Sequence, residues 1–85
     1  MNAKTTRVTL YTASGCSHCQ RARQYLRQCH IRFGEQDISR SARALKAFQR
    51  WGGRTVPLLL IGETPIAGFD QRRIVKTLRD AGFDV

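Results

Sequence analysis

Apolar and polar side chains alternate along Arg7–Thr12, and the segment is rich in β-branched residues. A period of two with this composition predicts a strand. From Cys16 to Cys29 the apolar residues instead recur every three or four positions, as they do along one face of a helix. These positions are Cys19, Ala22, Leu26 and Cys29. The pattern therefore predicts a strand that leads directly into a helix.

The same reasoning predicts five further elements. They are a strand over Ile31–Ile38, a helix that begins at Ser39 or Ser41 and ends at Trp51–Gly53, a buried strand over Val56–Ile61, a short strand over Thr64–Ala67 and a helix that begins at Asp70 and ends at Ala81–Gly82. The first helix would join two parallel strands, and the turn at Gly62 and Glu63 would close an antiparallel hairpin. The order predicts an α/β fold, a four-stranded mixed sheet with helices on both faces.

Two cysteines, Cys16 and Cys19, lie three residues apart where the first strand gives way to the helix. A Cys-x-x-Cys motif in this position indicates a redox site. Side chains at this spacing on a helix are neighbours, so a reversible disulfide can close with little backbone motion. The helix N-terminus stabilises a thiolate, which is the nucleophilic form. We therefore expect Cys16 to attack and Cys19, one turn further and more buried, to resolve.

The chain of 85 residues is long enough for one small domain, which we expect to span residues 1–85. Met1–Thr6 is polar, and no apolar run approaches the roughly 20 residues that cross a bilayer, so we expect neither a secretory signal nor a membrane segment. A cytoplasmic location follows as the default. In that compartment a Cys-x-x-Cys pair is more often catalytic or metal-binding than structural.

The net charge of +9 fits two interpretations, a solvated basic surface or attraction to an anionic partner. We expect no nucleic-acid binding, because the basic residues are scattered and no aromatic residues are interleaved with them. We also expect no metal site in the single chain, because a structural zinc site needs four ligands and the candidates cannot converge from one helix. These candidates are Cys16, His18, Cys19 and Cys29.

Three short motifs stand at compatible positions: Cys16-Ser17-His18-Cys19, Thr55-Val56-Pro57 and Gly68-Phe69-Asp70. Together they resemble the glutaredoxins, which have the thioredoxin fold, over nearly the whole chain. The Gly-Phe form of the third motif is most similar to the small glutaredoxin-like proteins that include the hydrogen donors of ribonucleotide reductase. The resemblance implies a thioredoxin fold in the order βαβαββα and a monomeric thiol–disulfide oxidoreductase.

The resemblance also implies the reaction partners. The substrates would be protein disulfides or glutathione mixed disulfides, and ribonucleotide reductase is one candidate partner. Glutathione would act as a co-substrate, and no tightly bound cofactor is expected. The reductant is either glutathione or a thioredoxin-reductase-like flavoenzyme. An alternative within the family is a dimeric carrier of an iron–sulfur cluster, with glutathione as a further ligand.

The family's binding residues carry over to the matching positions of this chain. Pro57 would be cis and face the Cys16 sulfur, Val56 would offer its backbone to a bound peptide or glutathione, and Arg54 would meet a glutathione carboxylate. The full set of substrate-binding residues implied is Tyr11, Arg54, Thr55, Val56, Pro57, Gly68, Phe69 and Asp70. Two simpler interpretations stay open: Pro57 begins a strand, and Gly68-Phe69-Asp70 is an ordinary capped helix start.

The chain departs from the family pattern at three places. Ala13 replaces a common lysine, and Gln71 replaces a common acid that would meet the substrate ammonium, so strong glutathione affinity is in question. Ser17-His18 replaces the common Pro-Tyr, and we expect the His18 imidazole to tune the acidity of the thiols and make the pair more oxidising. An exposed histidine without consequence is the alternative.

Cys29, the third cysteine, lies ten residues after Cys19, about 15 Å away along a helix. The two cannot form a disulfide within one helix. We expect Cys29 to behave as a small hydrophobe, with secondary glutathionylation as the alternative.

Overall fold

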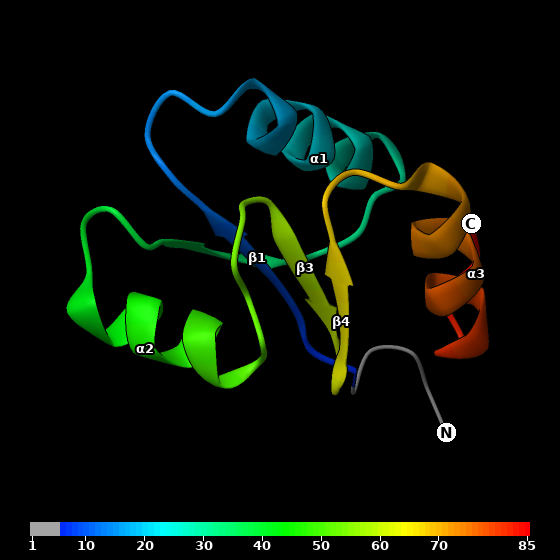
Figure 1. Cartoon of the computed structure of the whole chain (residues 1–85). Coiled ribbons are helices and arrows are strands. Elements are labelled where there is room, and N and C mark those ends of the chain that lie inside the picture. The colour runs from blue at the N-terminus through cyan, green and yellow to red at the C-terminus, as the bar shows by residue number, and fades with distance from the viewer. Residues whose placement is uncertain (1–5) are drawn as a thin grey trace.

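A computed structural model describes residues 6–85 and shows a four-stranded sheet with helices on both faces (Figure 1). The elements are β1 (Val8–Thr12), α1 (Ser17–Gln28), β2 (Gly34–Asp37), α2 (Ala42–Arg50), β3 (Leu58–Ile61), β4 (Thr64–Ala67) and α3 (Gln71–Asp80). The predicted order and the thioredoxin-like α/β architecture are confirmed. The expectation for the polar start Met1–Thr6 concerns residues that, Thr6 apart, lie outside the described part of the chain.

The strands are ordered β2-β1-β3-β4 across the sheet. Strand β1 runs parallel to β2 and antiparallel to β3, and β3 runs antiparallel to β4. Tyr11 is level with Leu58, and Leu58 is level with Ala67. One end of the sheet, beside the beginning of α1, is therefore formed by the end of β1, the start of β3 and the end of β4 (Figure 1).

Two core clusters lie on opposite faces of the sheet. Helices α1 and α3 cover the larger one, whose most buried members are Leu10, Leu26, Leu59, Ile66, Ile74 and Leu78. Helix α2 covers the smaller one, formed by Tyr11, Phe48, Leu58 and Leu60. Strand β3 contributes alternate side chains to both clusters and is buried along its whole length. This burial on two faces explains its uninterrupted apolar sequence.

Two strands are shorter than the sequence predicted. The N–H of Ile31 donates to the Leu26 carbonyl at 2.9 Å, so this part of the backbone completes the end of α1. His30 lies at the turn with a φ of 57°. Ile31 is buried just before β2 rather than within it. Likewise β3 begins at Leu58, because Pro57 has no N–H to give to the sheet.

The predicted helix starts are confirmed in detail. Ser41 is the cap of α2, and its hydroxyl accepts the Ala44 N–H at 3.1 Å. Asp70 caps α3, and its carboxylate accepts the Arg73 N–H at 3.3 Å. Within residues 6–85 none of the helices combines the length and the apolar character needed to cross a membrane.

Candidate redox site

Cys16 lies at the N-terminus of α1 and serves as its cap. The chain leaves β1 through a turn at Gly15, whose φ of 73° suits glycine. The Cys16 sulfur accepts the backbone N–H of Cys19 at 3.2 Å, the place usually taken by a hydroxyl or carboxylate oxygen. Its thiol also donates to the Val56 carbonyl at 3.8 Å. A half-buried sulfur at this position is available to a substrate.

Cys19 differs sharply from Cys16. Its side chain is 1% exposed, one turn into the helix. Burial raises the pKa of Cys19 to about 11, and the hydrogen bond with Cys16 contributes in the same direction. A backbone hydrogen bond with Ala13 and the positive charge of Arg23 act the other way on this pKa. Both thiols are free in the structure, and burial makes the Cys19 thiol hold its proton more firmly than an exposed cysteine would.

The Thr55-Val56-Pro57 segment packs against the cysteine pair. The Val56–Pro57 bond is cis, as the resemblance implied. Pro57 is buried, and its carbonyl accepts the Gly68 N–H at 2.9 Å. The Val56 carbonyl is the group next to the Cys16 sulfur. These two contacts bring all three motifs of the sequence together at this end of the sheet.

The Gly68-Phe69-Asp70 segment forms the entrance to α3. Gly68 has a φ of 74°, which a side chain would disfavour. Phe69 packs edge-on against Tyr25 of α1, with ring centroids 5.8 Å apart. Asp70 uses its carboxylate to cap the helix. The segment is therefore a well-formed capped start next to Pro57, and its part in substrate binding stays a prediction.

Other predicted residues are placed less directly. Tyr11 is buried against Phe48 beneath α2, with ring centroids 5.9 Å apart, so the structure gives it a packing role. Arg54, Thr55 and His18 are exposed near the pair. The roles of these four residues in binding or tuning stay predictions. Cys29 packs against the larger core cluster at the other end of α1, which confirms its hydrophobic character.

Sequence reasoning missed a polar network on the other side of Cys16. Glu35 of β2 receives two hydrogen bonds from the Arg23 guanidinium, at 2.7 and 2.6 Å, and a third from the Thr12 hydroxyl at 3.1 Å. Arg23 lowers the pKa of Glu35, and Glu35 raises the pKa of Arg23. These residues and Cys16 line the same small hollow, of about 280 Å³. Two signals stood in the sequence: Arg23, a cationic residue close to the cysteine pair on the same predicted helix, and Thr12, a polar residue in line with the inward Val8 and Leu10.

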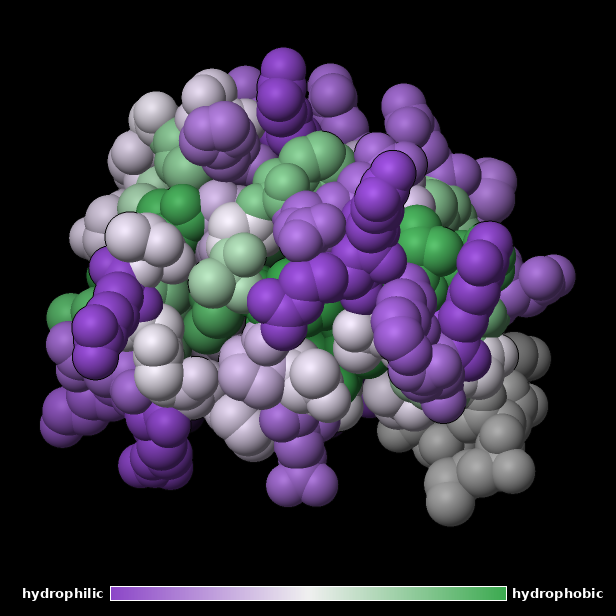
Figure 2. All heavy atoms as spheres, turned by 45° about the vertical axis from the view of Figure 1, so that its right-hand side comes forward, coloured by the Kyte–Doolittle hydropathy of each residue, from purple (hydrophilic) through white to green (hydrophobic). Residues whose placement is uncertain are grey.

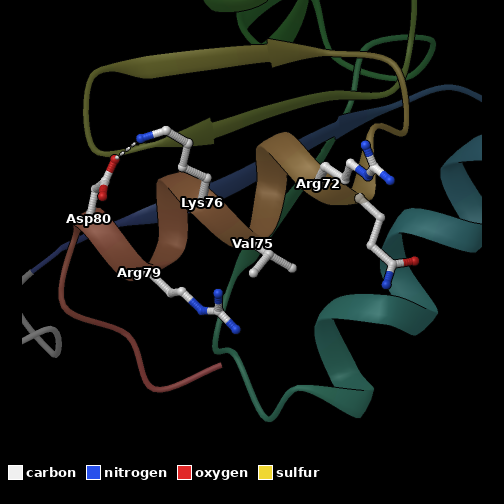
Figure 3. Close-up of a pocket in the computed structure, with 6 residues that line it drawn as sticks. Arg72, Val75, Lys76, Arg79 and Asp80 are labelled. Atoms are coloured by element: carbon white, nitrogen blue, oxygen red, sulfur yellow. Dashed lines mark hydrogen bonds and ion pairs between the residues drawn. The ribbon is translucent and has the colours of Figure 1, made fainter.

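A larger hollow lies elsewhere, on the outer side of α3. Its volume is about 600 Å³, and Figure 3 shows its basic side chains along the helix together with the Lys76–Asp80 ion pair, 3.3 Å long. The lining residues are Gln71, Arg72, Val75, Lys76, Arg79 and Asp80. Figure 2, which brings this side of the molecule forward, shows hydrophilic side chains spread over it. No motif residue lines this hollow, so size alone does not locate the chemistry.

Comparison with known proteins places the chain. The family model for glutaredoxin matches residues 8–66. No curated protein matches the chain. Among solved structures, a thioredoxin-like protein is 19% identical with a TM-score of 0.81, covering 84% of this chain and 99% of its own. NrdH-redoxin from Escherichia coli, described as glutaredoxin-like with a thioredoxin-like activity profile, is 24% identical with a TM-score of 0.74, covering 82% and 92%.

A third similar structure is a buckwheat glutaredoxin in complex with glutathione. It is 22% identical with a TM-score of 0.70, and the match covers 98% of this chain and 86% of that one. At these identities the solved structures support the thioredoxin fold. The family model spans more than half of the chain, and the Cys16–Cys19 pair sits at the helix start where the fold places its active site. The chain therefore belongs to the glutaredoxin family and is a thiol–disulfide oxidoreductase.

Proposed function

We propose that the chain reduces disulfides by a dithiol mechanism in which Cys16 is the nucleophile and Cys19 the resolving thiol. The observation that carries this proposal is the contrast between the two thiols. The Cys16 sulfur is half-buried and accepts a helix N–H, whereas Cys19 is buried with a pKa of about 11. The half-buried Cys16 thiol attacks the substrate first, and the buried Cys19 thiol then attacks Cys16.

The two steps balance as exchange reactions. The Cys16 thiolate attacks one sulfur of the substrate disulfide, forms a mixed disulfide and releases one substrate thiolate, which takes up a proton. The Cys19 sulfur then attacks Cys16, the intramolecular disulfide forms and the second substrate thiol leaves with the proton that Cys19 gave up. Two electrons pass from the protein to the substrate, and an external reductant restores both thiols.

The loop that holds Val56 and Pro57 is the proposed place for the substrate backbone. The Val56 carbonyl lies beside the Cys16 sulfur, where an extended peptide or glutathione could pair with it. Arg54, Thr55 and the start of α3 at Gly68–Asp70 would complete the binding surface. A glutaredoxin of this fold has been solved with glutathione, which supports a substrate of this kind.

Either glutathione or a thioredoxin-reductase-like flavoenzyme can serve as the reductant. The glutathione complex of the buckwheat protein supports the first, and the thioredoxin-like activity profile of NrdH-redoxin supports the second. In this chain Ala13 and Gln71 remove two charges that glutathione-binding relatives often carry, which weighs toward the flavoenzyme. We propose a cytoplasmic monomer acting on protein disulfides or glutathione mixed disulfides, with ribonucleotide reductase as one candidate partner.

The test is steady-state reduction of a mixed disulfide between glutathione and a small thiol. Wild type, Cys16→Ser, Cys19→Ser and the control Cys29→Ser are assayed with glutathione or with thioredoxin reductase as the electron source. We expect Cys16→Ser to lose activity with both reductants and Cys29→Ser to keep it. Activity with glutathione that survives in Cys19→Ser would mean a monothiol step with glutathione as the reductant, and Cys19 would then not be the resolving thiol. Activity with the flavoenzyme alone, lost in both active-site variants, would identify the flavoenzyme as the reductant and support the dithiol mechanism. A fully active Cys16→Ser variant would contradict the mechanism.

A further inference from the structure

Arg23 is held near the cysteine pair by Glu35, which Thr12 in turn holds in place. Arg23 lies one helical turn after Cys19 on α1, and it bonds to Glu35 on the neighbouring strand β2. The guanidinium uses two N–H groups on the two carboxylate oxygens, and the buried Thr12 hydroxyl donates to one of these oxygens. Both oxygens of Glu35 are therefore occupied, and the direction of the guanidinium is set.

The ion pair is more enclosed than an ordinary surface pair. Its side chains are 25% and 31% exposed, and it forms part of the polar hollow that Cys16 also lines. Exposed ion pairs contribute little because water screens them and the side chains must be ordered. A bidentate, partly enclosed pair with a third hydrogen bond keeps its geometry, so its field on nearby groups is steady.

The Arg23 guanidinium, the positive member of the ion pair, affects the acidity of Cys19. The positive charge of Arg23 lowers the pKa of Cys19, whereas the Cys16 thiol raises that pKa. Arg23 in turn is favoured in its charged form by Glu35 first, and by Cys19 and Cys16 as well. Arg23 lies four residues after Cys19 on α1 and lines the same hollow as Cys16, so the Glu35 carboxylate on β2 holds its charge close to the cysteine pair.

We propose that Arg23, held in place by Glu35 and Thr12, is a positioning residue that stabilises the buried Cys19 thiolate during the resolving step. The inference rests on the dithiol function proposed above. In that step the Cys19 S–H bond breaks, the Cys19–Cys16 S–S bond forms and the bond from Cys16 to the substrate sulfur breaks. The proton lost by Cys19 ends on the leaving substrate thiolate. A fixed positive charge favours the reaction because negative charge gathers on Cys19 just before attack.

Glu35 has a specific part in this arrangement. Without its carboxylate, the long Arg23 side chain is free to turn into water, where its charge is screened. The loss of Glu35 should therefore resemble the loss of Arg23, although the positive charge itself remains. This equivalence separates the proposal from a simple effect of net charge.

The experiment measures the resolving step by itself. The Cys16–glutathione mixed disulfide is prepared in a Cys29→Ser background, and the release of glutathione near neutral pH is followed in a single turnover. The variants are Arg23→Gln, Glu35→Gln and the conservative Arg23→Lys. Arg43→Gln, an exposed arginine on α2, is the matched control. In parallel, the titration of Cys19 is followed by thiolate absorbance in a Cys16→Ser, Cys29→Ser background.

We expect Arg23→Gln and Glu35→Gln to slow the release by about threefold to tenfold and to move the Cys19 titration upward by about half to one pH unit. Arg23→Lys should recover part of both effects, and Arg43→Gln should match the wild type. Unchanged release in both Arg23→Gln and Glu35→Gln would overturn the proposal, and so would slower release with an unchanged titration, which would assign the pair a purely structural role. If wild type itself releases no glutathione, the dithiol mechanism fails instead.

Discussion

The redox site has two flanks, one formed by backbone groups and the other by side chains. On the loop flank, formed by Val56, Pro57 and Gly68, the contacts are made by backbone groups: the Val56 carbonyl meets the Cys16 sulfur, and the Pro57 carbonyl meets the Gly68 N–H. On the polar flank, formed by Thr12, Arg23 and Glu35, every contact is made by side chains. Cys16 lies between the two.

This difference teaches which parts of the site depend on side-chain identity. A backbone surface needs residues that allow its conformation, so its sequence signal is glycine and proline rather than charge. A side-chain network needs particular functional groups, which can lie on distant elements such as α1 and β2. We therefore propose that the loop flank binds substrate and that the polar flank governs thiol chemistry, and changes on each flank should affect different measurements.

The largest expected effect concerns Cys19 and the stability of the reduced protein at high pH. The pKa of Cys19 is raised from 9.0 to about 11, so the folded state favours the protonated thiol. The resulting stability is present below pH 9 and is lost as pH rises through about 11. Two pKa units correspond to about 3 kcal/mol in the free energy of unfolding.

Urea unfolding of reduced wild type and reduced Cys19→Ala across this pH range measures the effect. We expect the wild type to lose about 2 to 3 kcal/mol more than the variant between pH 9 and pH 11. The variant serves as the reference for tyrosine and lysine titrations that both proteins share. Parallel curves for the two proteins would show that the buried thiol does not differ in acidity between the folded and unfolded states.

The second prediction separates the flanks by a change on the loop flank. Gly68 has a φ of 74° and open space around the position of a Cβ, so Gly68→Ala introduces backbone strain without a clash. We expect a loss of about 1 to 2 kcal/mol in stability and a severalfold rise in KM for the mixed disulfide, with the Cys19 titration unchanged. This is the reverse of the pattern expected for Arg23→Gln.

Gly34→Ala is the matched control for this substitution. Gly34 lies in β2, has no positive φ and also has open space at the Cβ position. Its replacement should leave KM unchanged. A shift of the Cys19 titration in Gly68→Ala would show that the loop flank also governs thiol acidity, and the division into two flanks would fail.

The loop flank could be predicted from the sequence, and the polar flank could not. The loop flank is recognisable from short sequence motifs, because few residue types other than proline and glycine would adopt the backbone conformations found at Pro57 and Gly68. Glu35 lies in β2, whose other residues are largely exposed, and the sequence around it does not indicate which residue it pairs with. Its position facing Arg23 depends on the register in which Leu10 is level with Glu35. A slip of one residue would turn Glu35 to the other face of the sheet.

The same reasoning explains Tyr11 and the strand limits. The alternation along β1 correctly separates Leu10 from Tyr11, yet it does not say which face the substrate approaches, and Tyr11 packs beneath α2. The order of elements was predictable because apolar residues recur at different spacings in strands and in helices. The start of β2 was not, because the N–H of Ile31 bonds to Leu26 at the end of α1, and the start of β3 was placed too early because Pro57 has no N–H for the sheet.

The smallest expected effect concerns the charge that the loop flank lacks. Gln71 is exposed in the first turn of α3, where there is no acidic residue. In relatives that bind glutathione well, an acid often stands there, in reach of the substrate ammonium. Gln71→Glu should therefore lower KM for glutathione by about twofold to fivefold, as expected for an exposed charge pair, while the Cys19 titration stays unchanged. The new carboxylate also suits the helix N-terminus, so stability should not fall.

Gln49→Glu on α2 makes the same change of charge on the opposite face of the sheet and serves as the control. Because the protein is basic overall, any added acid alters its general attraction for anionic glutathione, and this effect acts at long range. The general effect should weaken glutathione binding equally in both variants, whereas a local ammonium contact should strengthen it in Gln71→Glu alone. Equal KM values in the two variants would therefore show that glutathione does not lie along the start of α3.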